Sequence, residues 1–171
     1  MLRFAAIFLV LVVVLFAAEL TQPVQRALVI PFTEGLAATS ALLLKAFDAD
    51  VVSHGRVLQS VKSGFAISIE PGCNGVEAAI VLMAAMVAFA APWRQRFAGI
   101  AAGLATVQVM NLARIVSLFY LGQWSLPVFE FAHLYLWQAL IMLDVLIVWL
   151  LWLRWLPGTD ASTAAPAPAP T

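Results

Sequence analysis

The sequence predicts an all-α polytopic membrane protein, and its composition and apolar stretches carry that prediction. Of the 171 residues, 64% are hydrophobic and only 11% are charged. Soluble domains are about 45–50% apolar and about 25% charged. This composition excludes a soluble enzyme and a disordered scaffold, and it leaves few polar residues to carry a function.

The charge balance and the cysteine content exclude further classes of protein. Nine Lys and Arg residues balance nine Asp and Glu residues, so we expect no polybasic face and no nucleic-acid partner. The single cysteine excludes an internal disulfide and any zinc site that needs two thiolates. No motif implies a metal or another cofactor.

Four apolar stretches approach the length of about 20 residues that a membrane-crossing helix needs. The first, residues 4–20, is expected to be an uncleaved anchor, because Phe16-Ala17-Ala18-Glu19 matches a small-x-small cleavage site poorly. The other three are residues 76–91, 97–121 and 133–156.

A fifth stretch, residues 27–47, leaves the number of crossings open. It is apolar but interrupted by Pro31, Glu34 and Lys45, among other residues, so it either spans the membrane or lies in the interface as an amphipathic helix. If it spans, there are five transmembrane helices and the N-terminus lies outside. If it does not, there are four, and Arg3 lies inside.

Lys and Arg near the ends of the apolar stretches predict the orientation. Cytoplasmic loops of membrane proteins are enriched in these residues. Arg94 and Arg96 place the loop between the third and fourth stretches in the cytoplasm, and Arg154 places the end of the last span there too. Residues 48–75 and 122–133 are therefore expected on the outer face.

The interval of residues 48–72 is the one polar part of the chain before its C-terminal tail. Val57, Val61 and residues 65–69 are rich in β-branched side chains, and Lys62-Ser63-Gly64 between them is typical of a turn. The pattern predicts a short extracytoplasmic β-hairpin before the third hydrophobic segment.

Domain boundaries follow from the same pattern. Residues 1–156 are predicted to form a single integral membrane domain. Residues 157–171, which are rich in Ala and Pro, are predicted to be a disordered tail without chemistry.

Arg114 is the polar residue whose place in an apolar stretch is most costly. An arginine in a bilayer helix costs at least about 2.5–3.5 kcal/mol and usually faces the bundle interior with a partner. Asn111 lies on the same helical face, three residues earlier, which favours a polar seam over an arginine that only extends to the headgroups. Asp144 in the last span is expected to be paired or protonated, and its role is not evident.

Cys73 lies at the start of the third hydrophobic segment, between Pro71-Gly72 and Asn74-Gly75. A lone cysteine in a membrane helix is commonly just a small apolar residue. At a helix N-terminus, however, the helix dipole lowers the pKa of a thiol, and a neighbouring cation lowers it further, as a nucleophile requires. Glu77, one turn later, would orient a cationic partner or stabilise the helix start.

His133 opens the last span and is a candidate general acid and base. The alternative is an interfacial histidine in an aromatic belt with Tyr135 and Trp137. His54 is a weaker candidate, because it lies in the polar stretch Ser53-His54-Gly55.

The ordered motifs on successive segments resemble those of a known family. Pro71-Gly72-Cys73-Asn74-Gly75, Asn111-Leu112-Ala113-Arg114-Ile115 and Ala132-His133 resemble the exosortase/archaeosortase family of membrane cysteine transpeptidases, and most closely its exosortase H subgroup. The resemblance covers residues 20–156. Many members have Cys-Ser-Gly where this chain has Cys-Asn-Gly, and many have more spans.

The resemblance implies a catalytic set of Cys73, Arg114 and His133, with Glu77 and Asn111 as supporting residues by their spacing. It implies a multi-pass protein of the bacterial inner membrane whose site faces the extracytoplasmic side. Its partners would be secreted proteins with a C-terminal sorting signal, which consists of a short motif such as Ile-Pro-Thr-Leu, a transmembrane helix and a basic tip. These would be cleaved and transferred, through a thioester, to an unknown envelope acceptor.

Two other interpretations remain open at this point. In a non-catalytic assembly or transporter subunit, Asn111, Arg114 and Asp144 would only hold helices together, and Cys73 would be inert. A metal or haem site would use both His54 and His133, although nothing in the sequence brings these two residues together.

Overall fold

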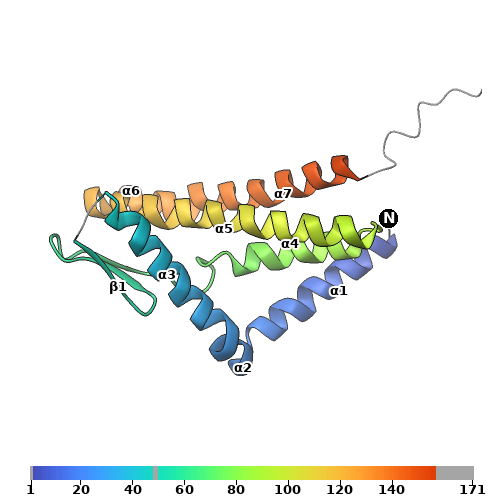
Figure 1. The fold of residues 1–171 in the computed structure, drawn as a ribbon, viewed down its shortest axis with the longest axis horizontal. Helices are drawn as coiled ribbons and strands as arrows, with labels where there is room; N and C mark the ends of the chain where they lie inside the picture. The colour runs from blue at the N-terminus through green and yellow to red at the C-terminus, as the bar shows by residue number, and fades with distance from the viewer. Residues whose placement is uncertain (1, 48–49, 157–171) are drawn as a thin grey trace, which may run out of the picture.

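The computed structural model describes residues 2–47 and 50–156 of the chain, so the predicted tail at residues 157–171 lies outside the described residues. The described part is mostly helical, as predicted, with one small sheet (Figure 1). The helices are α1 (Leu2–Glu19), α2 (Gln22–Val24), the π-helix η1 (Gln25–Val29), α3 (Ile30–Lys45), α4 (Val76–Ala88), α5 (Trp93–Trp124), α6 (Leu126–Phe131), the π-helix η2 (Ala132–Leu136) and α7 (Trp137–Trp155).

Helices α4, α5 and α7 run side by side and form the body of the molecule, while α1 and α3 form the two arms of a V that meet at α2 (Figure 1). The N-terminus lies beside the turn between α4 and α5, where Phe4 contacts the rings of Phe89 and Trp149. Trp152 near the end of α7 also packs on Phe89 there.

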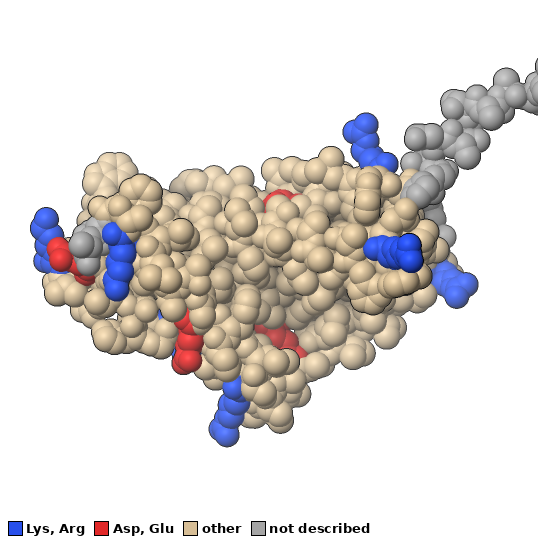
Figure 2. Space-filling view, in the orientation of Figure 1, with Lys and Arg blue, Asp and Glu red and all other residues tan. Residues whose placement is uncertain are grey.

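The two ends of the bundle differ in their charges. One end, here called the arginine end, contains Arg3, Arg94, Arg96 and Arg154 and both termini of the bundle. The other, here called the sheet end, contains the three strands and α6, with the cations Lys45, Arg56 and Lys62 beside the carboxylates of Asp50 and Glu70. Figure 2 shows Lys and Arg at these two ends and at the corner formed by α2, with a mostly uncharged belt between them.

Within residues 2–47 and 50–156, four helical segments are long and apolar enough to cross a membrane, namely Leu2–Glu19, Gln22–Lys45, Trp93–Trp124 and Leu126–Trp155. The predicted span at residues 76–91 is shorter than expected, because α4 has 13 residues and a length of about 20 Å. Conversely, the 32 residues of α5 extend about 48 Å, well beyond a hydrocarbon core of about 30 Å. The outer turns of α5 therefore support the sheet.

The path of α1 and α3 bears on the number of crossings. The two helices together run from the arginine end to the sheet end (Figure 1). The N-terminus thus lies at the same end of the molecule as Arg94 and Arg154. Whether residues 27–47 form a separate crossing stays a prediction, because Gln22–Lys45 is itself long and apolar enough to span a membrane.

The polar interval forms a three-stranded antiparallel sheet, which contains the predicted hairpin and one further strand. Its strands β1 (Val51–His54), β2 (Val57–Ser60) and β3 (Ala66–Ser68) pair in that order. The hairpin between β2 and β3 is the predicted one, with Leu58 opposite Ile67. The additional strand β1 pairs His54 with Val57 across a turn in which Gly55 has φ +57°.

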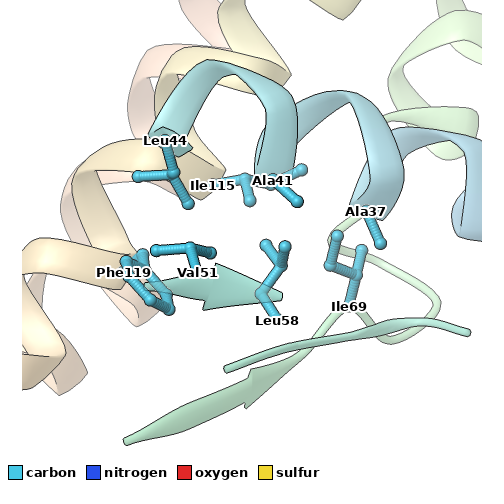
Figure 3. Packing of buried hydrophobic residues seen from close by; sticks show 8 residues of the cluster. All are labelled: Ala37, Ala41, Leu44, Val51, Leu58, Ile69, Ile115 and Phe119. Atoms are coloured by element: carbon cyan, nitrogen blue, oxygen red, sulfur yellow. The ribbon is translucent and has the colours of Figure 1, made fainter. Parts of the chain in front are cut away.

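One hydrophobic core joins the sheet to the helices (Figure 3). It lies between α3, the sheet and the outer turns of α5, and its buried members are Ala37, Ala41, Leu44, Val51, Leu58, Ile69, Ile115 and Phe119. A second core holds α4, α5 and α7 together along the bundle. Its buried members are Ala78, Leu82, Met86, Val107, Ile141, Val145, Trp152 and Leu156.

Small residues let α5 approach its neighbours closely. Gly99 and Gly103 are both buried and are four residues apart, the spacing that allows close packing of membrane helices. A Cβ atom on Gly99 would overlap the indole of Trp152, and one on Gly103 would meet the side chain of Leu82. The Trp152 indole also donates a hydrogen bond to the backbone oxygen of Gln95, at 2.9 Å.

We expect Gly99→Ala to destabilise the protein by about 1–3 kcal/mol, because the added methyl group displaces the Trp152 indole in a well-packed core. Thermal unfolding of the detergent-solubilised protein, followed by tryptophan fluorescence, measures the effect. Gly35→Ala is the control, since nothing lies within 4 Å of a Cβ atom there and alanine favours the helix by up to about 1 kcal/mol. Equal midpoints for the two variants would contradict the packing of α5 on α7.

Candidate active site

Residues 70–75 form a tight loop that leads into α4. Gly72 and Gly75 have φ values of +86° and +77°, a region that side chains other than hydrogen disfavour. The Cys73 N–H donates to the backbone oxygen of Glu70 at 2.9 Å, and the Gly72 N–H donates to the carboxylate of Glu77. These two bonds hold the backbone on both sides of the thiol.

Asn74 ties this loop to α3. Its side chain is fully buried, donates to the Thr33 hydroxyl at 3.1 Å and accepts from the Val76 N–H at 3.0 Å. The second bond satisfies one of the free N–H groups in the first turn of α4. Sequence analysis treated Asn74 only as a turn former and missed Thr33, although a polar residue on a helix with a buried apolar face was the available signal.

Three side chains from separate segments meet at this loop. The Sγ atom of Cys73 lies 3.1 Å from Nε2 of His133. Arg114 Nη2 lies 3.5 Å from the same sulfur, and Arg114 Nη1 lies 3.5 Å from the backbone oxygen of Gly72. The structure thus brings together the three residues that the sequence analysis singled out, while their roles in catalysis stay a prediction.

The two partners of the thiol are held from different sides. Arg114 lies in α5 and is only 4% exposed. His133 lies in the π-helix η2, a local irregularity that is frequent at functional sites, and its ring packs on Phe129 at 5.5 Å between centroids. Because α6 and η2 precede α7 without a break, the imidazole is fixed at the sheet end of the last candidate span.

A small cavity of about 50 Å³ opens at these three residues. Its other walls are the residues Ile67, Ser68 and Ile69, which belong to β3 and its end, and Ile115, Leu118 and Phe129. The thiol is half-buried at this cavity. A group that enters along β3 therefore reaches the sulfur and the guanidinium together.

Burial raises the pKa of the Cys73 thiol above its ordinary value. The Arg114 guanidinium offsets this in part, and the carboxylates of Glu77 and Glu70 raise the pKa further. The predicted lowering by a neighbouring cation is confirmed for Arg114, but the predicted net lowering was wrong, because the sulfur is largely removed from water. At neutral pH the resting group is a thiol beside a base rather than a preformed thiolate.

We expect Glu77→Gln to lower the pKa of the Cys73 thiol and to raise its alkylation rate by iodoacetamide several-fold at pH 7.5. Glutamine keeps the acceptor for the Gly72 N–H but removes a negative charge, so the thiolate, which is the reacting form, becomes more populated. The chain has one cysteine, so the label reports this thiol alone. Glu34→Gln, which changes a carboxylate that does not act on the thiol, should leave the pH profile unchanged. An unchanged or upward-shifted profile for Glu77→Gln would contradict this electrostatic account.

The other candidate residues, Asn111, His54 and Asp144, make no hydrogen bond to the thiol. Asn111 is fully buried, and both its amide atoms lack a hydrogen-bond partner within the described part of the chain. It packs against Gly75, where a Cβ atom would lie 3.3 Å from its Cγ. His54 is exposed in β1, and Asp144 lies within α7 with a buried Oδ2 that has no partner among the described residues.

Comparison with known proteins identifies the family. Residues 1–152 match the family model of the transmembrane exosortase (Exosortase_EpsH). The match covers most of the chain, which therefore belongs to the transmembrane exosortase family, as its motifs predicted. The assignment to the exosortase H subgroup stays a prediction. Searches of curated proteins and of solved structures give no match.

Proposed function

We propose that this member of the transmembrane exosortase family is a cysteine transpeptidase that cleaves the C-terminal sorting signal of secreted proteins. The cleaved protein is carried as a thioester on Cys73 and transferred to a cell-envelope acceptor. The observation that carries the proposal is the meeting of a thiol, an imidazole and a guanidinium within 3.1–3.5 Å. These groups come from three segments that are far apart in the sequence, and helix packing alone does not require that they converge.

In this mechanism His133 first acts as the general base. As the sulfur of Cys73 attacks the peptide carbonyl, its proton passes to Nε2 of His133 over the 3.1 Å contact. The imidazolium then gives that proton to the leaving amine, and the C–N bond breaks to leave the thioester. In the second half, His133 takes a proton from the acceptor nucleophile, which attacks the thioester and displaces the thiolate. The imidazolium then returns its proton to the sulfur, which restores the starting state.

Arg114 is the donor for the negative charge that develops on the carbonyl oxygen. The N–H groups of Gly72 and Cys73 are already engaged, so they are not free to form an oxyanion hole. The guanidinium, in contrast, faces the sulfur and the Gly72 carbonyl with long contacts of 3.5 Å. A charged donor fixed in a largely water-free place stabilises such an oxyanion strongly.

The sheet supplies a place for the extended motif of the substrate. β3 is an edge strand, and residues at its end line the cavity of Cys73. An extended peptide that adds to such an edge gains backbone hydrogen bonds and places alternate side chains in pockets. The motif would thus be held beside the thiol, with its transmembrane helix continuing into the bilayer.

The charge distribution supports an extracytoplasmic active site in the bacterial inner membrane. By the preference of Lys and Arg for the cytoplasmic side, the arginine end faces the cytoplasm. The sheet end and Cys73 then face outward. A membrane-impermeant maleimide applied to intact spheroplasts should label Cys73, and labelling only after lysis would overturn this orientation.

The function is tested with a secreted reporter that carries an N-terminal tag and a C-terminal signal of Ile-Pro-Thr-Leu, an apolar helix and a basic tip. We expect its cleavage in cells that contain this chain and no cleavage in cells that lack it. A reporter without the Ile-Pro-Thr-Leu motif is the matched control and should stay intact. A reporter that stays intact in the presence of the chain but co-purifies with it would favour the non-catalytic assembly subunit.

A further inference from the structure

A second and larger cavity lies apart from the candidate active site. Its volume is about 590 Å³, within the range of about 300–1,000 Å³ that is typical of ligand sites. It lies between α1, the α2–α3 segment, α4 and α5, in the angle of the V that Figure 1 shows. None of its lining residues lines the cavity at Cys73.

The walls of this cavity are almost entirely apolar. They include Leu28 and Phe32 from the α2–α3 segment, Ile80 and Met83 from α4, and Leu104 from α5. Such walls within a membrane bundle favour a hydrocarbon chain as the occupant.

Two polar groups at the cavity lack a partner. Glu19, the last residue of α1, is only 5% exposed, yet its carboxylate has no hydrogen bond among the described residues. Arg56 and Glu70 form an ion pair elsewhere in the described part of the chain, and Glu19 takes no part in it. The Oε1 atom of Gln108 is likewise buried without a partner. Both groups are hydrogen-bond acceptors, and a buried carboxylate without a donor is costly.

The polar and apolar parts of the cavity lie at different depths. Glu19 ends α1 at the corner of the V and is followed by the exposed residues Leu20, Thr21 and Gln22. Along α4, the lining residues continue from Val76 near the loop to Met83 two turns further inside the bundle. A donor-rich head above an apolar tail matches this arrangement.

We propose that this cavity binds one phospholipid with a primary ammonium headgroup, whose N–H donors pair with the carboxylate of Glu19 while an acyl chain fills the apolar part. A carboxylate at the polar end of the cavity disfavours an anionic lipid. A quaternary ammonium lipid has the charge but no N–H donor, so it leaves the carboxylate of Glu19 without a hydrogen bond. The proposal does not depend on the catalytic role of Cys73.

Native mass spectrometry of the full-length protein, released from mixed micelles with equal amounts of phosphatidylethanolamine, phosphatidylcholine and phosphatidylglycerol, tests this inference. The wild type should retain one phosphatidylethanolamine at least about fivefold over either other lipid, a difference of about 1 kcal/mol. Glu19→Gln should reduce this preference to about equal retention. Asp144→Asn is the matched control, since it alters another poorly paired carboxyl of the bundle outside the cavity, and it should keep the preference.

Two further experiments identify the source of the ammonium group and the place where the lipid binds. Ethanolamine in solution should not displace the retained lipid, whereas displacement would mean that the site takes a free amine. Met83→Trp, which narrows the apolar part, should lower retention of the lipid with the fold verified by gel filtration. No retained lipid in the wild type, equal retention of the three lipids, or an unchanged preference in Glu19→Gln would overturn the proposal.

Discussion

Cys73→Ala is expected to abolish processing of the reporter, with a fall of at least about 10³-fold to the background rate. The thiol is the group that forms the covalent bond in the proposed reaction, and alanine leaves nothing in its place to attack the carbonyl. Quantitative immunoblotting of the cleaved reporter over time measures the rate. Processing by Cys73→Ala at the wild-type rate would contradict the assignment of the nucleophile.

Cys73→Ser is the matched companion of this variant. Serine keeps the size and the hydrogen-bonding capacity of the side chain next to His133, so the fold of the loop should be retained. Its hydroxyl is a much weaker nucleophile than a thiol, and we expect processing close to background in this variant too. If the free energy of unfolding of both variants lies within about 1 kcal/mol of the wild-type value, the loss of processing lies in the chemistry and not in the fold.

Arg114→Lys is expected to slow processing by about 10²–10³-fold, which is the cost of losing one donor to an oxyanion. Lysine keeps the positive charge but lacks the planar guanidinium, whose two Nη atoms contact the sulfur and the Gly72 carbonyl oxygen at the same time. Arg114→Gln removes the charge as well and is expected to be at least as slow. The rate constant for single-turnover cleavage of the reporter in membranes measures both.

The control for Arg114 is Arg154→Gln, which removes an arginine at the other end of the bundle and should leave the rate within about twofold of the wild type. Alkylation of Cys73 gives a second readout that does not depend on substrate. Because the guanidinium lowers the pKa of the thiol, Arg114→Gln should shift the alkylation profile to higher pH. A wild-type rate in Arg114→Lys together with an unshifted profile in Arg114→Gln would assign Arg114 to helix packing alone.

The membrane class could be predicted from composition, but the arrangement of the segments could not. Apolar content and length identify candidate spans, and the segments at residues 4–20 and 97–121 correspond to α1 and α5. They do not reveal that α4 ends at Ala88, or that the last turns of α5 pack against a sheet. The V formed by α1 and α3 also depends on packing against α4 and the sheet, which no periodicity in residues 27–47 encodes.

The candidate site was more accessible to sequence reasoning than the fold, because an arginine within an apolar helix is costly wherever that helix packs. Cys73 and His133 were recognisable from helix-terminal position and from the ordered motifs of the family. The contact between Asn74 and Thr33 was not, because it joins two residues 41 positions apart. The direction of the pKa shift of Cys73 was also missed, since it depends on how deeply the folded loop buries the sulfur.

The most direct test of the central claim is to look for the thioester itself. The protein is mixed with the reporter in membranes, quenched in acid within a single turnover, and digested for mass spectrometry of the peptide that contains Cys73. The account predicts an adduct of the reporter on this sulfur that neutral hydroxylamine removes and that is absent from Cys73→Ala. Cleaved reporter that accumulates at the wild-type rate while Cys73 stays unmodified at every time point would contradict it.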